Sequence, residues 1–416
     1  MIAITNESSA AVKTTYPQYR FVIAGLILFA NFSIGLNWYS VAPLMPPIMM
    51  SFSITASLAS LLVALPLLIK SIVGLPGSVI LARYGLQHIF TVSWFMLGAL
   101  TLSWVAPNYL ALLVLRLCYG IGAAFMMPAM GTLVMQWFPA NERTIVNSVN
   151  LVIISLGITF SYAVAAPLAS ITSWQFVLGL FGAIGLLGAV AWSLLGRTQT
   201  HMEDERVIFT INDVGEVLQN KTILLLLLGD SLVFTCYAAL SDWLPSYYFQ
   251  IRGLSLSRAG NITGLLSFIG IFAVLLGGYL TMKVKEKKLM FIIPGILVAL
   301  GGFGSFLASN ITVIYLSVIL LGIGAWVYQP ILLSLPMELD WMTPNKIAIV
   351  WGASMTIAGF GMFVSPIIVG ASQDYFGSYL PGFIASTLPA LMLIFTGIFL
   401  PANERVGKTL GGDQLI

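Results

Sequence analysis

Charge is scarce in this sequence. Asp, Glu, Lys and Arg make up 8% of its 416 residues, whereas hydrophobic residues make up 59%. Soluble domains usually carry about 25% charged residues, so the composition excludes an ordinary soluble protein. Cysteine and histidine are nearly absent, with two of each, which leaves no disulfide framework or metal spacing. The sequence contains no nucleotide loop, catalytic triad or nucleic-acid motif, so we expect no enzyme, no cofactor and no nucleic-acid partner.

The hydrophobic residues gather in twelve long runs. A hydrocarbon core of about 30 Å requires roughly 20 apolar residues per helix. These runs are continuous, unlike the alternating segments of about ten residues that form outer-membrane barrels. We therefore predict an all-α membrane protein with twelve transmembrane helices. The runs lie near 20–49, 57–82, 89–106, 109–137, 144–170, 174–195, 223–248, 257–282, 288–308, 311–337, 346–371 and 380–400.

The basic residues predict the orientation in the membrane. The first 19 residues are polar and carry no cleavable signal pattern, so the first run should remain as a helix. Most of the 18 Lys and Arg residues fall on one side if the N-terminus is cytoplasmic. The positive-inside rule therefore predicts a multi-pass protein of the cell membrane with both termini in the cytoplasm. Trp94, Trp104, Trp174, Trp192 and Trp243 are placed like interfacial anchors.

One pattern occurs twice, half a chain apart. Gly120-Ile121-Gly122-Ala123 leads to Pro128, and Gly322-Ile323-Gly324-Ala325 leads to Pro330. A duplicated membrane half indicates a transporter that rocks two halves around a central site. We predict an N-terminal six-helix bundle (1–195), a cytoplasmic linker (196–222) with a short amphipathic helix at 212–218, and a C-terminal six-helix bundle (223–416).

Several motifs resemble those of the major facilitator superfamily. Residues 116–123 resemble its Arg-x-x-x-Gly-x-Gly-Ala pattern on helix 4, and 137–143 resemble the loop that follows. Residues 243–245 resemble the end of its helix 7, and 374–377 the exit of its helix 11. The resemblance covers nearly the whole chain. It implies two pseudo-symmetric six-helix bundles, a monomer and alternating access.

Lys70 lies deep in the second apolar run, thirteen residues before Arg83. At about 1.5 Å per residue it is roughly 20 Å from the inner interface, too deep for easy snorkelling. A charge there costs about 2.5–3.5 kcal/mol even on the lenient insertion scale. We interpret it first as an anion-binding ammonium in a central cavity. A buried pair with a carboxylate, or a lysine with a role in proton coupling, remains open.

Arg116 occupies the outer half of helix 4. A guanidinium suits bidentate recognition of a carboxylate, so substrate contact and helix packing are equally open. In related sugar/proton symporters an acid on helix 1 partners this arginine, but helix 1 here has no acid. Uncharged groups complete the candidate substrate site, although such groups often only bond neighbouring helices. They are Asn37, Tyr39, Asn150, Tyr237 and Gln329.

Asp230 is the only acid well inside helix 7. It is a candidate proton-coupling carboxylate or counter-ion of Lys70, although the two differ by roughly 8 Å in depth at about 1.5 Å per residue. An acid facing an inner vestibule is the alternative. Candidate gate residues, which could pair when one side closes, lie near the helix ends. They are Asp242, Arg143, Glu338 and Asp340, with Lys346 as a further basic partner.

These residues favour a secondary active transporter for a small anion, with a carboxylate as first choice, coupled to protons or working by exchange. The alternative is proton-coupled efflux of hydrophobic drug-like compounds, with Asp230 as the acid. Helix 5 lacks the Gly-Pro motif of drug/proton antiporters, since Gly157 and Pro167 are too far apart. Lys70 would also repel cationic drugs.

Overall fold

The computed structural model describes residues 18–198, 211–339 and 341–400. All regular elements in these ranges are helices, as the composition predicts. The first half of the chain forms α1 (Arg20–Trp38), η1 (Ala42–Leu44), α2 (Met45–Phe52), α3 (Ala56–Tyr84), α4 (Leu86–Gly98), η2 (Ala99–Val105), α5 (Tyr109–Trp137), α6 (Ala140–Ile171) and α7 (Trp174–Leu195).

The second half begins with a short helix that confirms the amphipathic helix predicted at 212–218. This half comprises α8 (Ile211–Gln219), α9 (Lys221–Gln250), α10 (Leu256–Lys283), α11 (Leu289–Leu307), α12 (Ile311–Trp326), α13 (Gln329–Ser334), η3 (Leu335–Glu338), α14 (Pro344–Phe376), α15 (Leu380–Thr387), η4 (Leu388–Leu391) and α16 (Met392–Phe399).

Twelve segments of the described chain are long and apolar enough to cross a membrane, which confirms the predicted number. Four of the runs predicted as single helices are composite, because each contains a change of helix type or a break. Prolines explain most of these changes, since proline lacks the N–H that continues a helix. Pro43 lies in η1, Pro330 in α13 and Pro389 in η4.

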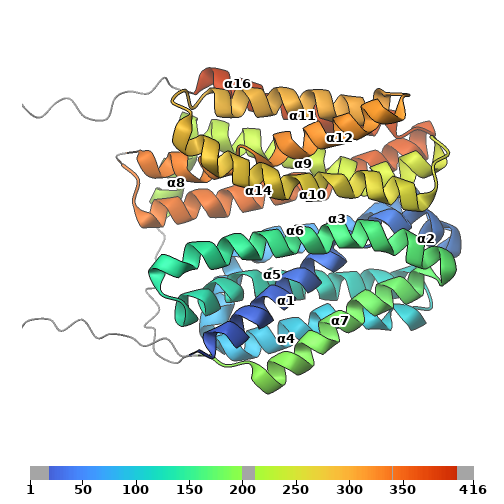
Figure 1. Cartoon of the computed structure of the whole chain (residues 1–416), viewed down its shortest axis with the longest axis horizontal. Helices are drawn as coiled ribbons and strands as arrows, with labels where there is room; N and C mark the ends of the chain where they lie inside the picture. The colour runs from blue at the N-terminus through green and yellow to red at the C-terminus, as the bar shows by residue number, and fades with distance from the viewer. Residues whose placement is uncertain (1–17, 199–210, 340, 401–416) are drawn as a thin grey trace, which may run out of the picture.

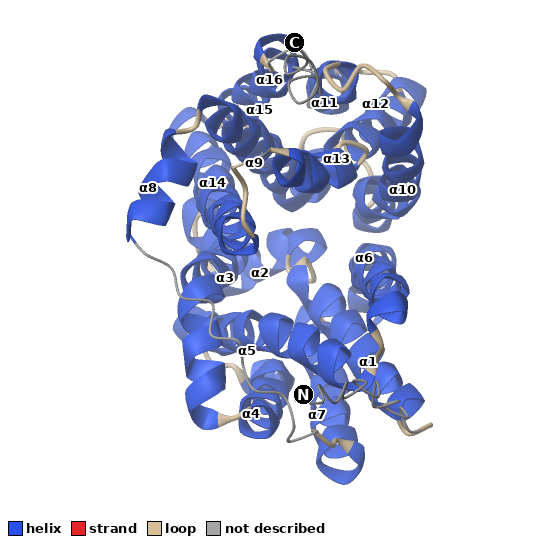
Figure 2. Cartoon of the chain, turned by 90° about the vertical axis from the view of Figure 1, so that its left-hand side faces the viewer, coloured by secondary structure: helices blue, strands red, loops and turns tan. Residues whose placement is uncertain are grey.

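The helices form two groups that lie side by side (Figures 1 and 2). We call α1–α7 the first half and α8–α16 the second half. Two seams join them: α3 packs on α14, and α6 packs on α10. The end where α1 begins and α16 ends is called the terminal end, and the opposite end the far end.

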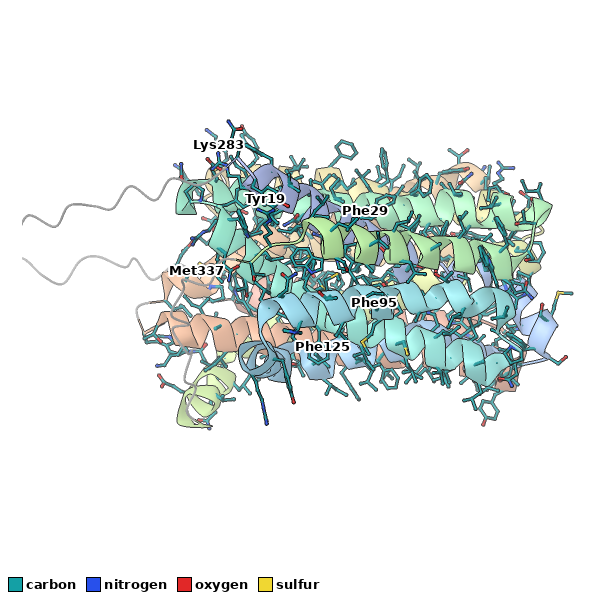
Figure 3. The ribbon with its side chains drawn as sticks, turned by 90° about the horizontal axis from the view of Figure 1, so that it is seen from below. Tyr19, Phe29, Phe95, Phe125, Lys283 and Met337 are labelled. Carbon is teal, nitrogen blue, oxygen red and sulfur yellow. The ribbon has the colours of Figure 1, made fainter. Side chains whose placement is uncertain are left out.

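Large apolar side chains cover much of the outer surface. Phe95 on α4 is 54% exposed and Leu187 on α7 is 63% exposed. Figure 3 shows Phe95 from below, with Tyr19, Lys283 and Met337 towards the terminal end. An apolar surface of this kind fits a protein surrounded by lipid, where hydrocarbon replaces water around the helices.

Glycines allow the two halves to approach closely at the seams. A methyl group at Gly260 on α10 would lie 2.7 Å from the carbonyl oxygen of Tyr162 on α6. A methyl group at Gly370 on α14 would lie 2.7 Å from the carbonyl oxygen of Ala56 on α3. Small residues at membrane helix interfaces permit such backbone contact.

A carboxylate of the second half caps a helix of the first half at the far end. Asp374 on α14 accepts hydrogen bonds from the backbone N–H groups of Ala56 (2.9 Å) and Ser57 (2.8 Å). The first N–H groups of a helix have no partner within the helix, and the positive end of the helix dipole favours an anion there. The start of α3 is thus held by an acid from the other half.

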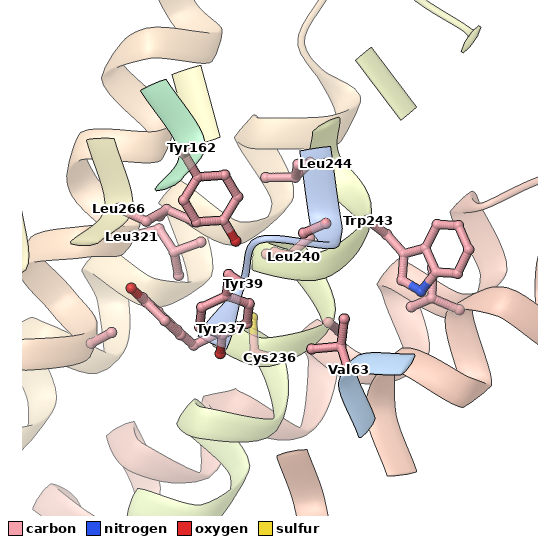
Figure 4. Close-up of a cluster of buried hydrophobic side chains, with 14 of the residues drawn as sticks. Tyr39, Val63, Tyr162, Cys236, Tyr237, Leu240, Trp243, Leu244, Leu266 and Leu321 are labelled. Atoms are coloured by element: carbon pink, nitrogen blue, oxygen red, sulfur yellow. The ribbon is translucent and has the colours of Figure 1, made fainter. Parts of the chain in front are cut away.

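A second contact between the halves lies deeper in the molecule. The Tyr162 hydroxyl on α6 donates to the carbonyl oxygen of Ser241 on α9, at 2.8 Å. The Tyr162 ring stacks on Tyr39, which follows α1, at 6.0 Å between centroids. Figure 4 shows Tyr39, Tyr162 and Tyr237 in the same buried cluster. Aromatic packing therefore closes the space between the halves at this level.

Ion pairs at the terminal end stay within one half each. Arg20 on α1 pairs with Glu142 on α6 at 3.1 Å, and Lys346 on α14 pairs with Glu216 on α8 at 2.8 Å. In the described chain, no ion pair links the two halves at this end. The polar contacts between the halves that we describe lie from the middle to the far end.

Candidate substrate and coupling sites

Lys70 lies midway along α3, about 21 Å from either end at about 1.5 Å per residue. Its ammonium nitrogen sits 4.1 Å from the ring centroid of Trp38, the last residue of α1. A small cavity of about 10 Å³ adjoins it, close to the size that one water needs. The lining residues come from α1, α3 and α5, and are Trp38, Pro66, Leu67, Lys70, Tyr119, Gly120, Ala123 and Met127.

Lys70 has no carboxylate partner within the described residues. The ion pairs there join Arg20 to Glu142, Lys287 to Glu338, and Lys346 to Glu216. A cation over an indole face gains only part of what a counter-ion would supply. An ammonium in this position therefore retains a strong electrostatic attraction for an anion.

Arg116 is fully buried and donates to three backbone carbonyls. Its Nε bonds to Leu62 O (2.7 Å), and its two terminal nitrogens bond to Asn37 O (2.7 Å) and Trp38 O (3.0 Å). The last two carbonyls belong to the end of α1, where helix carbonyls lack partners within the helix. Of the two interpretations of Arg116, this geometry fits helix packing.

Asn37 and Tyr39 lie in the packed core at the end of α1. Asn37 is 0% exposed, and its amide donates to Ser33 O (3.0 Å) and to Phe181 O on α7 (3.1 Å). Tyr39 is 3% exposed and stacks on both Trp38 and Tyr162. In this conformation both side chains are buried by the surrounding helices.

Asp230 on α9 accepts three side-chain hydrogen bonds. Tyr328 (2.9 Å) and Gln329 (2.7 Å) donate to its Oδ1, and Ser354 on α14 donates to its Oδ2 (2.8 Å). Asp230 is 3% exposed. The counter-ion role towards Lys70 is thus absent from this conformation, because donors of the second half occupy both carboxylate oxygens.

The break after α12 is what brings two donors to Asp230. α12 ends at Trp326 and α13 begins at Gln329, with Pro330 in its first turn. A residue before proline is biased away from the helical conformation. In the first half the matching Pro128 lies inside the continuous helix α5. The repeated sequence pattern therefore lies in a continuous helix in the first half and in an interrupted helix in the second half.

Tyr237 belongs to an aromatic wall on the second half. Its hydroxyl and that of Ser267 on α10 are 3.1 Å apart, in hydrogen-bond contact. Its ring meets Trp326 edge to face at 5.9 Å, and Trp326 meets Phe234 at 5.3 Å. Asn150 lies on α6 of the first half, half-buried, and its amide oxygen has no hydrogen-bond partner in the described protein.

The candidate gate residues have partners within their own half, or none. Arg143 donates to the carbonyls of Met135 and Phe138, both at 2.9 Å, and Glu338 pairs with Lys287. Asp242 is fully buried, and neither of its carboxylate oxygens has a hydrogen-bond partner in the described chain. Asp340 lies outside the described residues. Pairing of these groups across the halves stays a prediction for another conformation.

Two residues that organise these sites were not among the predicted site residues. Ser354 gave no signal, since a serine in a membrane helix usually bonds its own backbone. Asp374 stands in the motif resembling the helix 11 exit, but its contact with the start of α3 joins residues more than 300 positions apart. Such long-range pairing cannot be read from local spacing.

The model of the Major Facilitator Superfamily matches residues 27–366. The chain belongs to this superfamily. This confirms the resemblance drawn from the motifs on α5, α9 and α14, and with it the twelve-helix fold. The superfamily consists of membrane transporters, which agrees with the duplicated halves and the buried charges described above.

Curated relatives of this superfamily member are similar at low identity. The hexuronate transporter of Escherichia coli K12 is 24% identical over 321 residues, which cover 70% of this chain and 72% of that one. The hexuronate transporter of Bacillus subtilis 168 is 24% identical over 374 residues (81% and 84%). The nitrite extrusion protein of B. subtilis 168 is 22% identical over 398 residues (92% and 94%).

Solved structures share the fold. A bacterial homologue of the human lysosomal transporter Spinster, in an inward-facing and unoccupied conformation, aligns with a TM-score of 0.71 at 16% identity, covering 93% of this chain and 95% of that one. The D-xylose–proton symporter aligns with a TM-score of 0.69 at 16% identity, covering 94% and 100%.

Proposed function

We propose that this member of the superfamily is a secondary active transporter of a small organic anion, bound through its carboxylate at Lys70. The single observation that carries the proposal is the ammonium of Lys70 at mid-membrane, with the Trp38 ring beside it and no carboxylate partner within the described residues. A charge this far from both ends of an apolar helix is costly and marks a substrate or ion pathway. An anion would supply the missing counter-charge.

The relatives support a sugar acid as the substrate class. Two of them are named hexuronate transporters and a further one a probable galactarate/D-glucarate transporter. Such molecules carry a carboxylate for Lys70 and several hydroxyl groups. Gln329 and Ser354 on the second half are half-buried polar groups suited to bind hydroxyls. The substrate would then bridge the two halves.

The proposed mechanism is alternating access. The two halves close at the far end through the Asp374 cap and the Tyr162 bond to Ser241. Transport would require these contacts to break while contacts form at the terminal end. We further propose that the protein lies in the cell membrane with the terminal end in the cytoplasm, is a monomer, and couples transport to protons or to exchange.

Ligand-induced thermal stabilisation of the purified protein tests the proposal. A ligand that binds the folded state raises its apparent stability with increasing occupancy. The panel contains a hexuronate, galactarate, nitrite, a neutral hexose and a lipophilic cation. We expect the sugar acids to stabilise wild type and not Lys70→Ala. Lys283→Ala is the matched control, because Lys283 is an exposed lysine at the end of α10.

The results separate the alternatives. Uptake of the stabilising acid into proteoliposomes should occur with wild type and Lys283→Ala and be lost in Lys70→Ala. Stabilisation by the lipophilic cation alone, equal in wild type and Lys70→Ala, would contradict the proposal and favour efflux of hydrophobic compounds.

A further inference from the structure

Two carboxylates are buried along α9, and their surroundings differ sharply. Asp230 is 3% exposed and accepts hydrogen bonds from Tyr328, Gln329 and Ser354. Asp242 is 0% exposed, and neither of its oxygens has a hydrogen-bond partner in the described protein. On the same helix, Asp230 has protein hydrogen-bond donors that take the place of water, whereas Asp242 has none in the described protein.

Asp242 lies in the part of α9 that meets the first half. The preceding residue, Ser241, accepts the hydrogen bond from Tyr162 across the seam. Its apolar neighbours in sequence, Leu240, Trp243 and Leu244, are each 0% exposed. Figure 4 shows these three residues around the same level as Tyr162 and Tyr39. The burial of Asp242 thus depends on the first half being seated against the second.

Three ionisable groups of the first half interact electrostatically with Asp242. They are Arg116 on α5, Tyr39 after α1, and Tyr162 on α6. Arg116 is the only cation among them, but it forms no ion pair with Asp242, and its donors bond to the carbonyls of Leu62, Asn37 and Trp38. The Tyr162 hydroxyl donates a hydrogen bond to Ser241 O. None of the three donates a hydrogen bond to Asp242.

The ionised form of Asp242 is therefore the costly one. Moving a carboxylate out of water without hydrogen bonds or a close counter-ion is far more unfavourable than moving a neutral carboxylic acid. The long-range attraction of Arg116 offsets only part of this cost. In the conformation described here, the favoured state of Asp242 is the neutral acid.

We propose that Asp242 is a proton-binding site whose occupancy permits the halves to close at the far end. When the halves separate there, Asp242 meets water and its O–H bond breaks, giving the proton to that water. On closing, the carboxylate takes a proton back from the same side. By linkage, conditions that favour protonation favour closure to the same extent. Its place in a transport cycle rests on the proposed function, but proton binding itself does not.

Infrared difference spectroscopy of the full-length protein tests the protonation state directly. At neutral pH, the wild-type-minus-Asp242→Asn spectrum should contain the carbonyl-stretch band of a protonated carboxyl group. The wild-type-minus-Asp230→Asn spectrum should lack it, because Asp230 has three donors for its anion. Absence of the band from the Asp242→Asn difference, or its presence only in the Asp230→Asn difference, overturns the proposal.

Cysteine labelling tests the link to closure. Ala56 is fully buried at the seam beside Asp374, so Ala56→Cys in a Cys118→Ser, Cys236→Ser background reports opening of the far end. Labelling is expressed relative to that of the same variant unfolded in denaturant at the same pH, because the thiolate is the reactive form of any cysteine. This ratio should rise with pH, and Asp242→Asn should abolish the dependence by holding the site closed. Asp230→Asn should show the same pH dependence as the Ala56→Cys variant without it. Asp242→Glu, which keeps a carboxyl group, should retain the dependence that Asp242→Asn loses.

A pH dependence unchanged by Asp242→Asn would refute the link. Neither measurement uses a substrate, so either can succeed if the anion assignment at Lys70 is wrong. Equally, loss of anion binding in Lys70→Ala leaves both readouts unaffected. Failure of this proposal and failure of the proposed function are therefore distinguishable.

Discussion

The guanidinium of Arg116 illustrates how a charge can be buried in a membrane protein without a carboxylate beside it. Its three described bonds go to backbone carbonyls of α1 and α3, one of which, Asn37 O, also accepts from the Ser40 hydroxyl at 3.1 Å. Hydrogen bonds between a charged donor and a buried acceptor are among the stronger ones in proteins. Arg116 thereby joins three helices of the first half, whereas Lys70 joins none.

Replacing Arg116 by alanine should mainly affect folding. The carbonyls of Leu62 and Trp38 would lose this donor, at a cost of about 1–3 kcal/mol for each group left unpaired, whereas Asn37 O keeps the Ser40 hydroxyl. We expect a large fall in the thermal unfolding temperature in detergent, whether or not an anion is added. Arg258→Ala, at an exposed arginine on α10, should unfold like wild type. A variant Arg116→Ala that is fully stable but no longer responds to the anion would instead indicate a substrate contact.

Ser354→Ala should destabilise the second half. It removes the only described donor to Oδ2 of Asp230, and a hydrogen bond to a charged group contributes about 1.5–3 kcal/mol. Thermal unfolding measures the change. Ser155→Ala is the matched control, because Ser155 on α6 donates only to Leu151 O of its own helix. Equal stability of the two variants would show that Asp230 does not need this donor.

At the scale of helices, the sequence predicts where each membrane span begins and ends better than it predicts which neighbour each face of a helix contacts. The twelve spans and the short helix α8 follow from runs of apolar residues and their interruptions. The helix continuity after the repeated Gly-x-Gly-Ala pattern does not follow from the sequence. Pro128 lies inside the continuous helix α5, whereas Pro330 follows a break between two helices. The difference depends on neighbouring helices that satisfy freed backbone groups, which no local pattern encodes.

The tryptophans show the same limit. Trp94, Trp192 and Trp243 were expected at the membrane interface, but each is 0% exposed. Trp243 instead donates from its indole to Pro366 O on α14, at 2.9 Å. An indole near a helix end can face lipid or a neighbouring helix, and the sequence gives its depth but not its direction. Of the five, Trp104, at 50% exposed, fits the predicted anchor.

Gly370→Ala should weaken the seam between α3 and α14. The added methyl group would lie 2.7 Å from the backbone oxygen of Ala56, and backbone cannot move aside as a flexible side chain can. We expect increased labelling of a cysteine at Ala56, because the far end would open more often. Gly278→Ala on α10 is the control, since a methyl group there meets no atom within 4 Å. Equal labelling in both variants would argue against a tight seam.

For the whole molecule, the distribution of charge predicts the orientation in the membrane. Lys283 ends α10 near the terminal end (Figure 3), and Lys285, Lys287 and Lys288 follow it before α11 begins. Basic loops are retained on the cytoplasmic side of the membrane. The same asymmetry would place the Asp374 cap and the buried Asp242 towards the outside of the cell.

Cysteine labelling in intact cells checks this orientation. In a Cys118→Ser, Cys236→Ser background, we expect Arg258→Cys at the far end to react with a membrane-impermeant maleimide. Lys283→Cys should react only after the cells are permeabilised. Both side chains are exposed, so a difference in reactivity reports the side of the membrane. The reverse pattern would place the terminal end outside.

The cap on α3 has a consequence for which substitutions the protein can accept. Asp374 contacts backbone N–H groups, which every residue except proline possesses. Position 57, which is half-buried, can therefore vary in side chain without loss of this bond. Ala56 is limited by its burial at the seam, and position 374 has to keep an acceptor of the right length. The two sides of one contact would thus drift at different rates through evolutionary time, with one partner free and the other constrained.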